Sequence, residues 1–277
     1  MNQLAEVFGY PPATDDAEAQ DARAGQQCPF IGRTCAKSSR LLSYRFGVCS
    51  VIYRHTICAT CPHRFEERGT SGSARVLEDI ARHYFGGLEN IIAFPEVRLP
   101  NVGSIDYVLV RHKPLLPEVE AFVAVEIQSD STTQTGAVVQ ALRDFMDGQY
   151  SNTQDYSFGM NTYDTIKRSM TQLFNKGIVY EAWGTHCYWV IQEYIYANLV
   201  QRYGFKTEGY CADEASRFAL YELNPQEGQL HLTPTRYIST SVEEVYQAMR
   251  HNPGLPHKDA FVKMLNARLQ LKFQLRP

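Results

Sequence analysis

The sequence predicts an α/β fold in which helices flank a mixed β-sheet, with a small metal-binding module at the N-terminus. The chain has 277 residues and is 44% hydrophobic, enough to bury a core without disulfide bonds. One helical segment is followed by three strand-like segments and then by alternating helices and strands, the order expected for a mixed sheet covered by helices. Five of the seven cysteines fall within 34 positions near the N-terminus, which indicates the metal-binding module.

Composition divides the chain into three parts. Residues 1–25 are polar and acidic and lack an apolar period, so we expect a flexible acidic arm. Residues 26–70 hold the clustered cysteines and only short apolar pieces, as is typical of a segment that a metal ion organises. The Gly/Ser-rich run 69–73 marks a boundary, and residues 71–277 are expected to form the larger domain.

The cysteine cluster contains more thiols than one tetrahedral site needs. An odd number of cysteines in a chain without an export signal argues against disulfides and favours a metal ion. By spacing alone, Cys58-x-x-Cys61 is the most obvious pair of ligands, because a CxxC loop places two thiolates on one ion. His55 and His63 are further candidates, and the alternative for both is a surface position.

The first regular element of the larger domain is a helix over residues 74–85. Its apolar positions recur on one helical face, Ser71 or Ser73 precedes them as N-cap, and Gly86 ends the run. Three strand-like segments follow, separated by proline-containing loops, and they are expected to be consecutive antiparallel strands. These segments span residues 90–99, 104–110 and 121–127.

Helices and strands alternate through the rest of the chain. Helical patterns occupy residues 137–147, 162–174 and 258–271, and β-type patterns occupy residues 187–192, 217–223 and 229–237. Ser241 and Glu244 have the spacing of a capping box, which predicts that a further helix begins there.

Two carboxylates come together when the second and third strands form a hairpin. Positions 106 and 126 are symmetric about the connecting loop, so Asp106 falls opposite Glu126 at one end of the hairpin. Gln128 lies two residues beyond Glu126 and shares its face of the strand. Oxygen ligands at this density suit a Mg²⁺ ion that also keeps waters and contacts a phosphate. Such an ion would polarise a phosphodiester and activate a water.

The alternative is that these acids simply face solvent, and their spacing alone favours that explanation. Asp106 and Glu126 nevertheless interrupt strongly apolar strands, where an unpaired buried carboxylate is costly. Acids in such places usually have a partner or a metal ion, so their placement favours a functional site.

Several short motifs occur in a fixed order between residues 28 and 193. They are Cys28-Pro29-Phe30, Cys35-Ala36-Lys37, Phe46-Gly47-Val48-Cys49-Ser50, Cys61-Pro62-His63-Arg64-Phe65, Glu126-Ile127-Gln128 and the segment 161–177. In this order they resemble the NotI-type restriction endonucleases of the PD-(D/E)XK superfamily. That family uses Glu-x-Gln where the superfamily usually has Glu-x-Lys, and it carries a four-cysteine metal site ahead of the nuclease core.

The resemblance implies a PD-(D/E)XK core in which Asp106 and Glu126 hold a divalent metal, expected to be Mg²⁺. Gln128 would occupy the place of the catalytic lysine, but glutamine carries no charge, so another cation is needed. Lys167 is the candidate for that cation, and Glu78 is the candidate to complete the metal shell. The alternative for both is a solvated side chain on a helix surface.

The resemblance also selects Cys28, Cys35, Cys49 and Cys61 as metal ligands and leaves Cys58 as an alternate. The ion would be iron or zinc, because four thiolates accept either. Its role would be structural, replacing a core that so short a segment lacks. The module would present basic side chains to phosphates or to the major groove, namely Arg33, Lys37, Arg40, Arg45 and Arg54.

The charge distribution suits a polyanionic partner. Residues 23–82 carry ten Lys or Arg against four acids, although the net charge of the chain is -3. By resemblance, the chain is a type II restriction endonuclease that cuts double-stranded DNA at a GC-rich palindrome. It would act as a homodimer, and its host would need a cognate DNA methyltransferase. The alternatives are an inactive, metal-stabilised DNA-binding protein and a repair or structure-specific nuclease on the same core.

No apolar run approaches the roughly 18–20 residues that a membrane span requires. The N-terminus lacks the basic start and the apolar stretch of a signal peptide. We therefore expect a cytoplasmic protein without membrane association.

Overall fold

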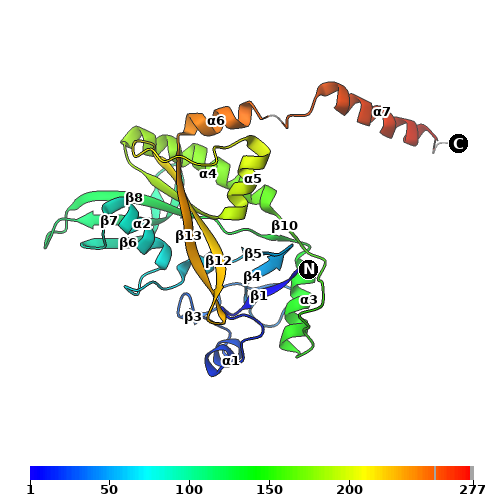
Figure 1. Cartoon of the computed structure of the whole chain (residues 1–277), viewed down its shortest axis with the longest axis horizontal. Coiled ribbons are helices and arrows are strands. Elements are labelled where there is room, and N and C mark those ends of the chain that lie inside the picture. Colours follow the sequence, from blue (N-terminus) through cyan, green and yellow to red (C-terminus); the bar gives the residue numbers. More distant parts are fainter. Residues whose placement is uncertain (253, 275–277) are drawn as a thin grey trace.

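The centre of the fold is a six-stranded mixed β-sheet with the strand order β13-β12-β11-β8-β7-β6 (Figure 1), which confirms the predicted class. The computed structural model describes residues 1–252 and 254–274. Neighbouring strands are antiparallel from β6 to β8 and between β12 and β13, whereas β11 runs parallel to both β8 and β12. The strands are β6 (Ile91–Leu99), β7 (Gly103–His112), β8 (Val119–Ile127), β11 (Cys187–Gln192), β12 (Ser216–Gln226) and β13 (Gln229–Thr240).

Helices cover both faces of this sheet. They are α2 (Arg75–Phe85), α4 (Thr162–Trp183), α5 (Glu193–Tyr203) and α6 (Val242–Arg250). The helices α4, α5 and α6 pack on one face, and α2 packs on the other. Alternate residues of β8 point to opposite faces of the sheet: Val123 and Val125 pack with α2, whereas Ala124 packs with α4. Glu126 therefore points toward α4.

The N-terminal part is built around a three-stranded antiparallel sheet in the order β1-β4-β5, which packs on α3. A two-stranded ribbon, β2 with β3, lies between β1 and β4 in the sequence. The elements are β1 (Gln3–Val7), α1 (Ala17–Ala24), β2 (Gln27–Cys28), β3 (Arg33–Thr34), β4 (Val48–Tyr53), β5 (Thr56–Ala59), the 3₁₀ helix η1 (Pro62–Glu66) and α3 (Thr135–Met146). Two short strands, β9 (Thr132–Thr133) and β10 (Gly159–Met160), pair with each other.

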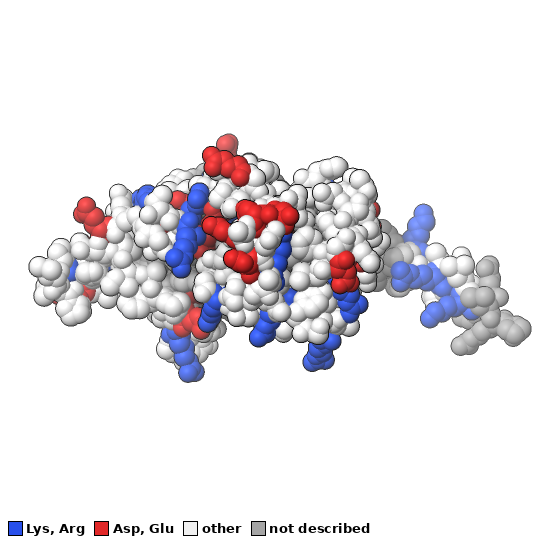
Figure 2. All heavy atoms as spheres, turned by 90° about the horizontal axis from the view of Figure 1, so that it is seen from below, with Lys and Arg blue, Asp and Glu red and all other residues white. Residues whose placement is uncertain are grey.

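The helix α7 (Lys258–Gln274) extends away from the rest of the molecule (Figure 1). Its basic side chains stand out at one end of Figure 2, whereas basic and acidic side chains are interspersed over the body shown there. These basic residues are Lys258, Lys263, Arg268 and Lys272. Neither α7 nor any other helix in the described part of the chain is long and apolar enough to cross a membrane.

Residues 1–25, expected to be a flexible arm, are folded. The strand β1 pairs with β4, and Leu4 and Val7 are buried. Asp16 begins α1 by accepting a hydrogen bond from the backbone N–H of Ala19 at 2.8 Å. The acidic composition suggested disorder, yet Glu6, the one acid of β1, is neutralised in the interior by a distant cation.

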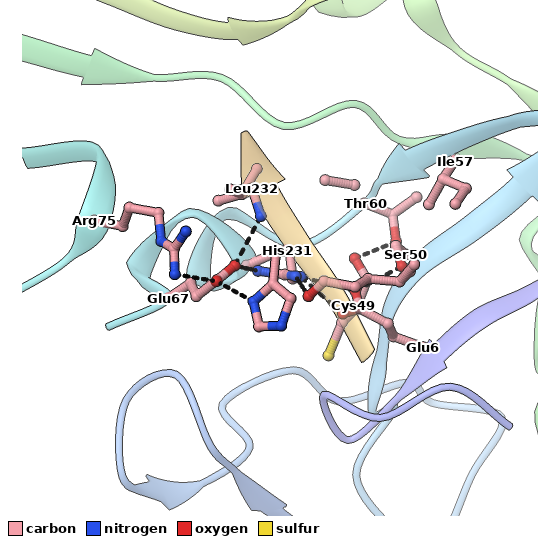
Figure 3. A network of polar contacts seen from close by, with 12 residues as sticks. Glu6, Cys49, Ser50, Ile57, Thr60, Glu67, Arg75, His231 and Leu232 are labelled. Atoms are coloured by element: carbon pink, nitrogen blue, oxygen red, sulfur yellow. Dashed lines mark hydrogen bonds and ion pairs between the residues drawn. The ribbon is translucent and has the colours of Figure 1, made fainter. Parts of the chain in front are cut away.

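A buried polar network fastens the N-terminal part to the sheet. The guanidinium of Arg64, 1% exposed, donates to both carboxylate oxygens of Glu6 at 2.9 Å and to Glu67 Oε2 at 2.7 Å. Glu67 also accepts from the backbone N–H of Leu232 at 2.9 Å, and its Oε1 lies 2.7 Å from His231 Nδ1 (Figure 3). The two expected domains therefore share a buried interface.

Most predicted elements are present with small shifts in their bounds. The strand β11 coincides with its predicted range, and the predicted capping box of Ser241 and Glu244 begins α6. The helix α4 extends beyond its predicted end, and α5 is an additional element. The N-cap predicted at Ser71 or Ser73 is wrong, because Ala74 takes that position and no side chain caps the helix.

Candidate active site

The β7–β8 hairpin brings Asp106 and Glu126 to one end, in the register predicted from the sequence. Tyr107 pairs with Val125, so Asp106 and Glu126 are the next positions along the two strands. The backbone N–H of Ile127 donates to Asp106 Oδ2 at 2.8 Å. This hydrogen bond holds the Asp106 carboxylate beside the end of β8.

Glu126 is 3% exposed and meets Lys176 of α4. The Lys176 ammonium donates to Glu126 Oε1 and to the backbone carbonyl of Ser104, both at 2.6 Å. The pKa of Glu126 is raised to about 7, mainly by burial; the charge of Asp106 also raises it, and the hydrogen bond and charge of Lys176 lower it. Burial also raises the pKa of Asp106, against the hydrogen bond from Ile127 and the charge of Lys176.

Each of the two carboxylates has one oxygen that the described residues leave without a hydrogen bond. No hydrogen bond from the residues that the structure describes reaches Asp106 Oδ1 or Glu126 Oε2. Magnesium ions in nuclease-type sites are held by one or two carboxylates, with waters and substrate phosphate completing the shell. The pair fits such an ion, because the engaged oxygens fix the orientation of the two that remain.

Asp106 and Gln128 line a cleft whose walls come from both parts of the chain. The Gln128 amide N–H donates to the carbonyl of Ser129 at 2.8 Å, and its amide oxygen accepts no hydrogen bond from the described residues. The cleft also holds three guanidinium groups, those of Arg33, Arg68 and Arg168. Guanidinium groups bind phosphates with paired hydrogen bonds, so this cleft suits a phosphodiester chain.

Glu96 also lines this cleft and was not predicted as a site residue. It lies in β6 and has a φ of 52°. Its neighbours Pro95 and Val97 pair with Tyr107 and Ile105 of β7. This places Glu96 opposite Asp106, and its charge adds to the effect of burial in raising the pKa of Asp106. The register of β6 with β7 is unbroken around this position, so the symmetry argument that pairs Asp106 with Glu126 could also have placed Glu96 opposite Asp106.

The structure does not bring Lys167 to the carboxylate pair. Lys167 is exposed, and its ammonium lies 2.9 Å from Asp164 Oδ1. Lys176, farther along the same helix, takes the position beside Glu126. It falls within the buried stripe of α4, which otherwise consists mainly of apolar residues. A lysine inside an apolar stripe is the sequence signal that could have identified it.

Glu78 is engaged by the loop before α2 and is not among the residues that line the cleft. Its carboxylate accepts hydrogen bonds from Ser71 N at 2.9 Å and Ser71 Oγ at 2.6 Å, and it pairs with Arg82 at 3.2 Å. Burial raises the pKa of Glu78, but these contacts outweigh burial and the net shift is downward. A Cβ at Gly69 would come within 2.4 Å of this carboxylate, so the loop fits tightly around it. Ser71 therefore binds Glu78 instead of capping the helix.

The four cysteines selected by resemblance are all buried in the N-terminal part. They are Cys28, Cys35, Cys49 and Cys61. Burial raises the pKa of Cys28, Cys49 and Cys61, and in each case the charge of other members of the set adds to the increase. Cys58 has different neighbours: burial raises its pKa to about 12, and its thiol lies near Tyr194 and Asp130.

Buried thiols that interact electrostatically with one another are suitable ligands for a soft or borderline metal ion. Within residues 1–252 and 254–274, however, no group of three or more His, Cys, Asp or Glu side chains is placed to hold a metal ion. The set of donors thus fits iron or zinc in kind, whereas an assembled shell of ligands is not present among these residues.

The family model of the restriction endonuclease NotI matches residues 7–208. The matched segment contains the cysteine set, both carboxylates and Lys176. No curated protein matches the chain.

Proposed function

Because the chain belongs to the NotI family of restriction endonucleases, we propose that it is a type II enzyme that uses Mg²⁺ to hydrolyse double-stranded DNA at a specific site. The observation that carries this proposal is the pair of carboxylates at the end of one hairpin. Asp106 and Glu126 each have one oxygen without a hydrogen bond from the described residues, and Asp106 lines a cleft that three arginines also line. The same hairpin, with helices on both faces of its sheet, supports a PD-(D/E)XK core.

Asp106 and Glu126 would hold the ion through these two oxygens. The bound ion would supply positive charge at the scissile phosphate and make a bound water more acidic. The hydrogen bond from Ile127 keeps Asp106 oriented before substrate arrives, which limits the reorganisation needed during the reaction. Gln128 can accept a hydrogen bond from the attacking water, since its amide oxygen has no partner in the described part of the chain.

Arg33, Arg68 and Arg168 would bind phosphates of the duplex. They come from β3, from the segment after η1 and from α4, so DNA in the cleft would contact both parts of the molecule. Contacts of this kind position a duplex without reading its sequence.

The four cysteines would bind iron or zinc in a structural role. Cys28 is the last residue of β2 and Cys35 directly follows β3, and the β2–β3 ribbon carries Arg33, which lines the cleft. Cys58 is left out of the proposed site, because its thiol lies near Tyr194 and Asp130 instead of the other four.

The proposed target is a GC-rich palindrome, and the proposed active form is a homodimer. One carboxylate pair per chain cuts one strand, so two copies related by a two-fold axis would cut both strands of a palindrome. A host that carries this enzyme in its cytoplasm would need a cognate DNA methyltransferase to protect its own sites.

The test is digestion of unmethylated, GC-rich plasmid and phage DNA in the presence of Mg²⁺. We expect discrete bands with the wild-type chain, and none with EDTA or with Glu126→Ala. Glu120→Ala is the matched control, because Glu120 lies on the same strand but is exposed, and it should cut like the wild type. Sequencing of the product ends would then define the target.

Two other outcomes would replace the proposal. A metal-dependent smear without bands would indicate a repair or structure-specific nuclease on the same core. Binding of the DNA without cleavage in either Mg²⁺ or Mn²⁺ would indicate an inactive, metal-stabilised DNA-binding protein.

A further inference from the structure

The proposed site lacks a cation on the strand where this core usually carries one. Gln128 follows Glu126 on the same face of β8, and an amide cannot stabilise negative charge as an ammonium does. The two carboxylates and the phosphate that they would approach all carry negative charge. A compensating cation from another element is therefore required.

Lys176 is the lysine that the fold delivers to this place. Its side chain is 6% exposed, and its ammonium bonds Glu126 Oε1 and the backbone carbonyl of Ser104, both at 2.6 Å. An ammonium has three protons, so one remains after these two contacts. The bond to Ser104 is important here, because it would hold Lys176 in position when Glu126 turns to a metal ion.

Building on the proposed function, we infer that Lys176 is the positioning residue that supplies, from α4, the positive charge that Gln128 cannot provide. It holds Glu126 by Oε1, and no hydrogen bond from the described residues engages Oε2. The same charge is in direct contact with Glu126, where it would offset the negative charge that develops at the site during the reaction.

The packing of α4 explains why the lysine stays in this position. Lys176 lies in the buried stripe of a 22-residue helix, between Leu173 and Tyr180, so its backbone cannot shift without disturbing the core. A buried ammonium without a partner is strongly disfavoured, and Glu126 and Ser104 provide the partners. Lys167 has neither the burial nor these contacts.

The experiment compares Lys176→Met, Lys176→Arg and the double variant Gln128→Lys/Lys176→Met, using a plasmid that the wild-type chain cuts. The matched control is Lys113→Met. Lys113 also lies 2.6 Å from a glutamate, Glu118, but this pair is exposed at the far end of the same hairpin. Three quantities are measured: kcat with KM for the plasmid, Mn²⁺ binding by calorimetry without DNA, and thermal unfolding.

We expect Lys176→Met to remain folded and to keep its KM, while kcat falls by about 100-fold or more. Mn²⁺ should bind more weakly to this variant, because Glu126 loses its orientation. Lys176→Arg should recover part of the loss, and Gln128→Lys should restore at least about 10-fold of the rate in the Lys176→Met background. Lys113→Met should match the wild type in every measurement.

Three results would overturn the inference. In the first, Lys176→Met retains kcat within about 3-fold of the wild type while Glu126→Ala is inactive; the proposed function then stands without Lys176. In the second, Lys176→Met loses stability, DNA binding and activity together and Gln128→Lys restores nothing, which makes the lysine purely structural. In the third, the wild-type chain does not cut DNA in any metal ion, which removes the proposed function and the inference with it.

Discussion

The guanidinium of Arg217, in β12, is 3% exposed and lies among aromatic side chains. It donates to the Tyr188 hydroxyl at 3.0 Å and to the carbonyl of Ala212 at 2.7 Å. His83 Nδ1 lies 2.6 Å from the same hydroxyl. The Tyr188 hydroxyl therefore accepts from Arg217 and also shares a hydrogen bond with His83 Nδ1. Burial and then the charge of Arg217 lower the pKa of both His83 and His186.

These two histidines make stability depend on pH. Their ordinary pKa is 6.5, and the folded state holds it lower, so the folded protein binds fewer protons than the unfolded chain as the pH falls below that value. The stability that the neutral histidines contribute is fully present above the ordinary pKa of 6.5, and it is lost as the pH falls below that value. We expect the free energy of unfolding in urea to fall between about pH 7.5 and 5.5, and to fall less steeply in His83→Gln/His186→Gln. Equal slopes for the two proteins would contradict this assignment.

Arg64 carries the buried charge network that joins the N-terminal part to β13. In Arg64→Met, Glu6 would remain fully buried without its partner, and removal of one member of a buried pair costs about 3–5 kcal/mol. The control Lys113→Met breaks an exposed pair and should change the free energy of unfolding by less than about 1 kcal/mol. Urea denaturation of both variants measures the difference. Similar small losses in the two would mean that the network stabilises no more than a surface pair does.

Among the elements, α4 packs closely against α6 at Gly177. A Cβ at this position would come within 2.7 Å of Val242 Cγ2. Replacing glycine by alanine within a helix favours folding by about 1 kcal/mol, but overpacking costs about 1–3 kcal/mol. We expect Gly177→Ala to lower the free energy of unfolding by about 1 kcal/mol, the net of these two effects.

The effect of Gly177→Ala on the free energy of unfolding should reverse in sign when Val242 is also replaced. Val242→Ala removes the methyl groups that Gly177→Ala would strike, so in that background the added alanine should stabilise the chain. Chemical denaturation of the four proteins in this cycle gives the coupling energy. Stabilisation by Gly177→Ala in the wild type would show that the two helices are not in close contact there.

Sequence patterns locate the elements well when the contacts between them are local. The hairpin places Asp106 opposite Glu126 by its own register, so their position across from each other could be predicted from the two strands. The apolar stripe of α4 marks Lys176 as a buried lysine, but its contact with Glu126 could not be predicted, because that contact depends on how α4 packs on the sheet. The same limit explains the error in residues 1–25, where Glu6 suggested disorder and its partner Arg64 lies far along the chain.

At the scale of the whole molecule, the N-terminal part and the sheet share one interior. Leu4 and Phe8 belong to the same apolar cluster as Val138 and Leu142 of α3, and Phe65 belongs to the cluster beneath the six-stranded sheet. The cleft is lined from both parts as well. Such packing predicts a single cooperative unit, although composition suggested a division near residue 70.

Native-state hydrogen exchange in increasing urea tests this cooperativity. We expect the amides of β4 and β11 to exchange through the same global opening, with free energies that agree within about 1 kcal/mol. The two free energies of opening should decrease together in Arg64→Met, because this variant weakens the interface between the N-terminal part and the six-stranded sheet. Exchange of β4 through a lower-energy opening, with β11 still protected, would mean that the N-terminal part unfolds separately. The cleft would then open while the carboxylate pair stays intact, and Arg33 could release DNA without any change at Asp106 and Glu126.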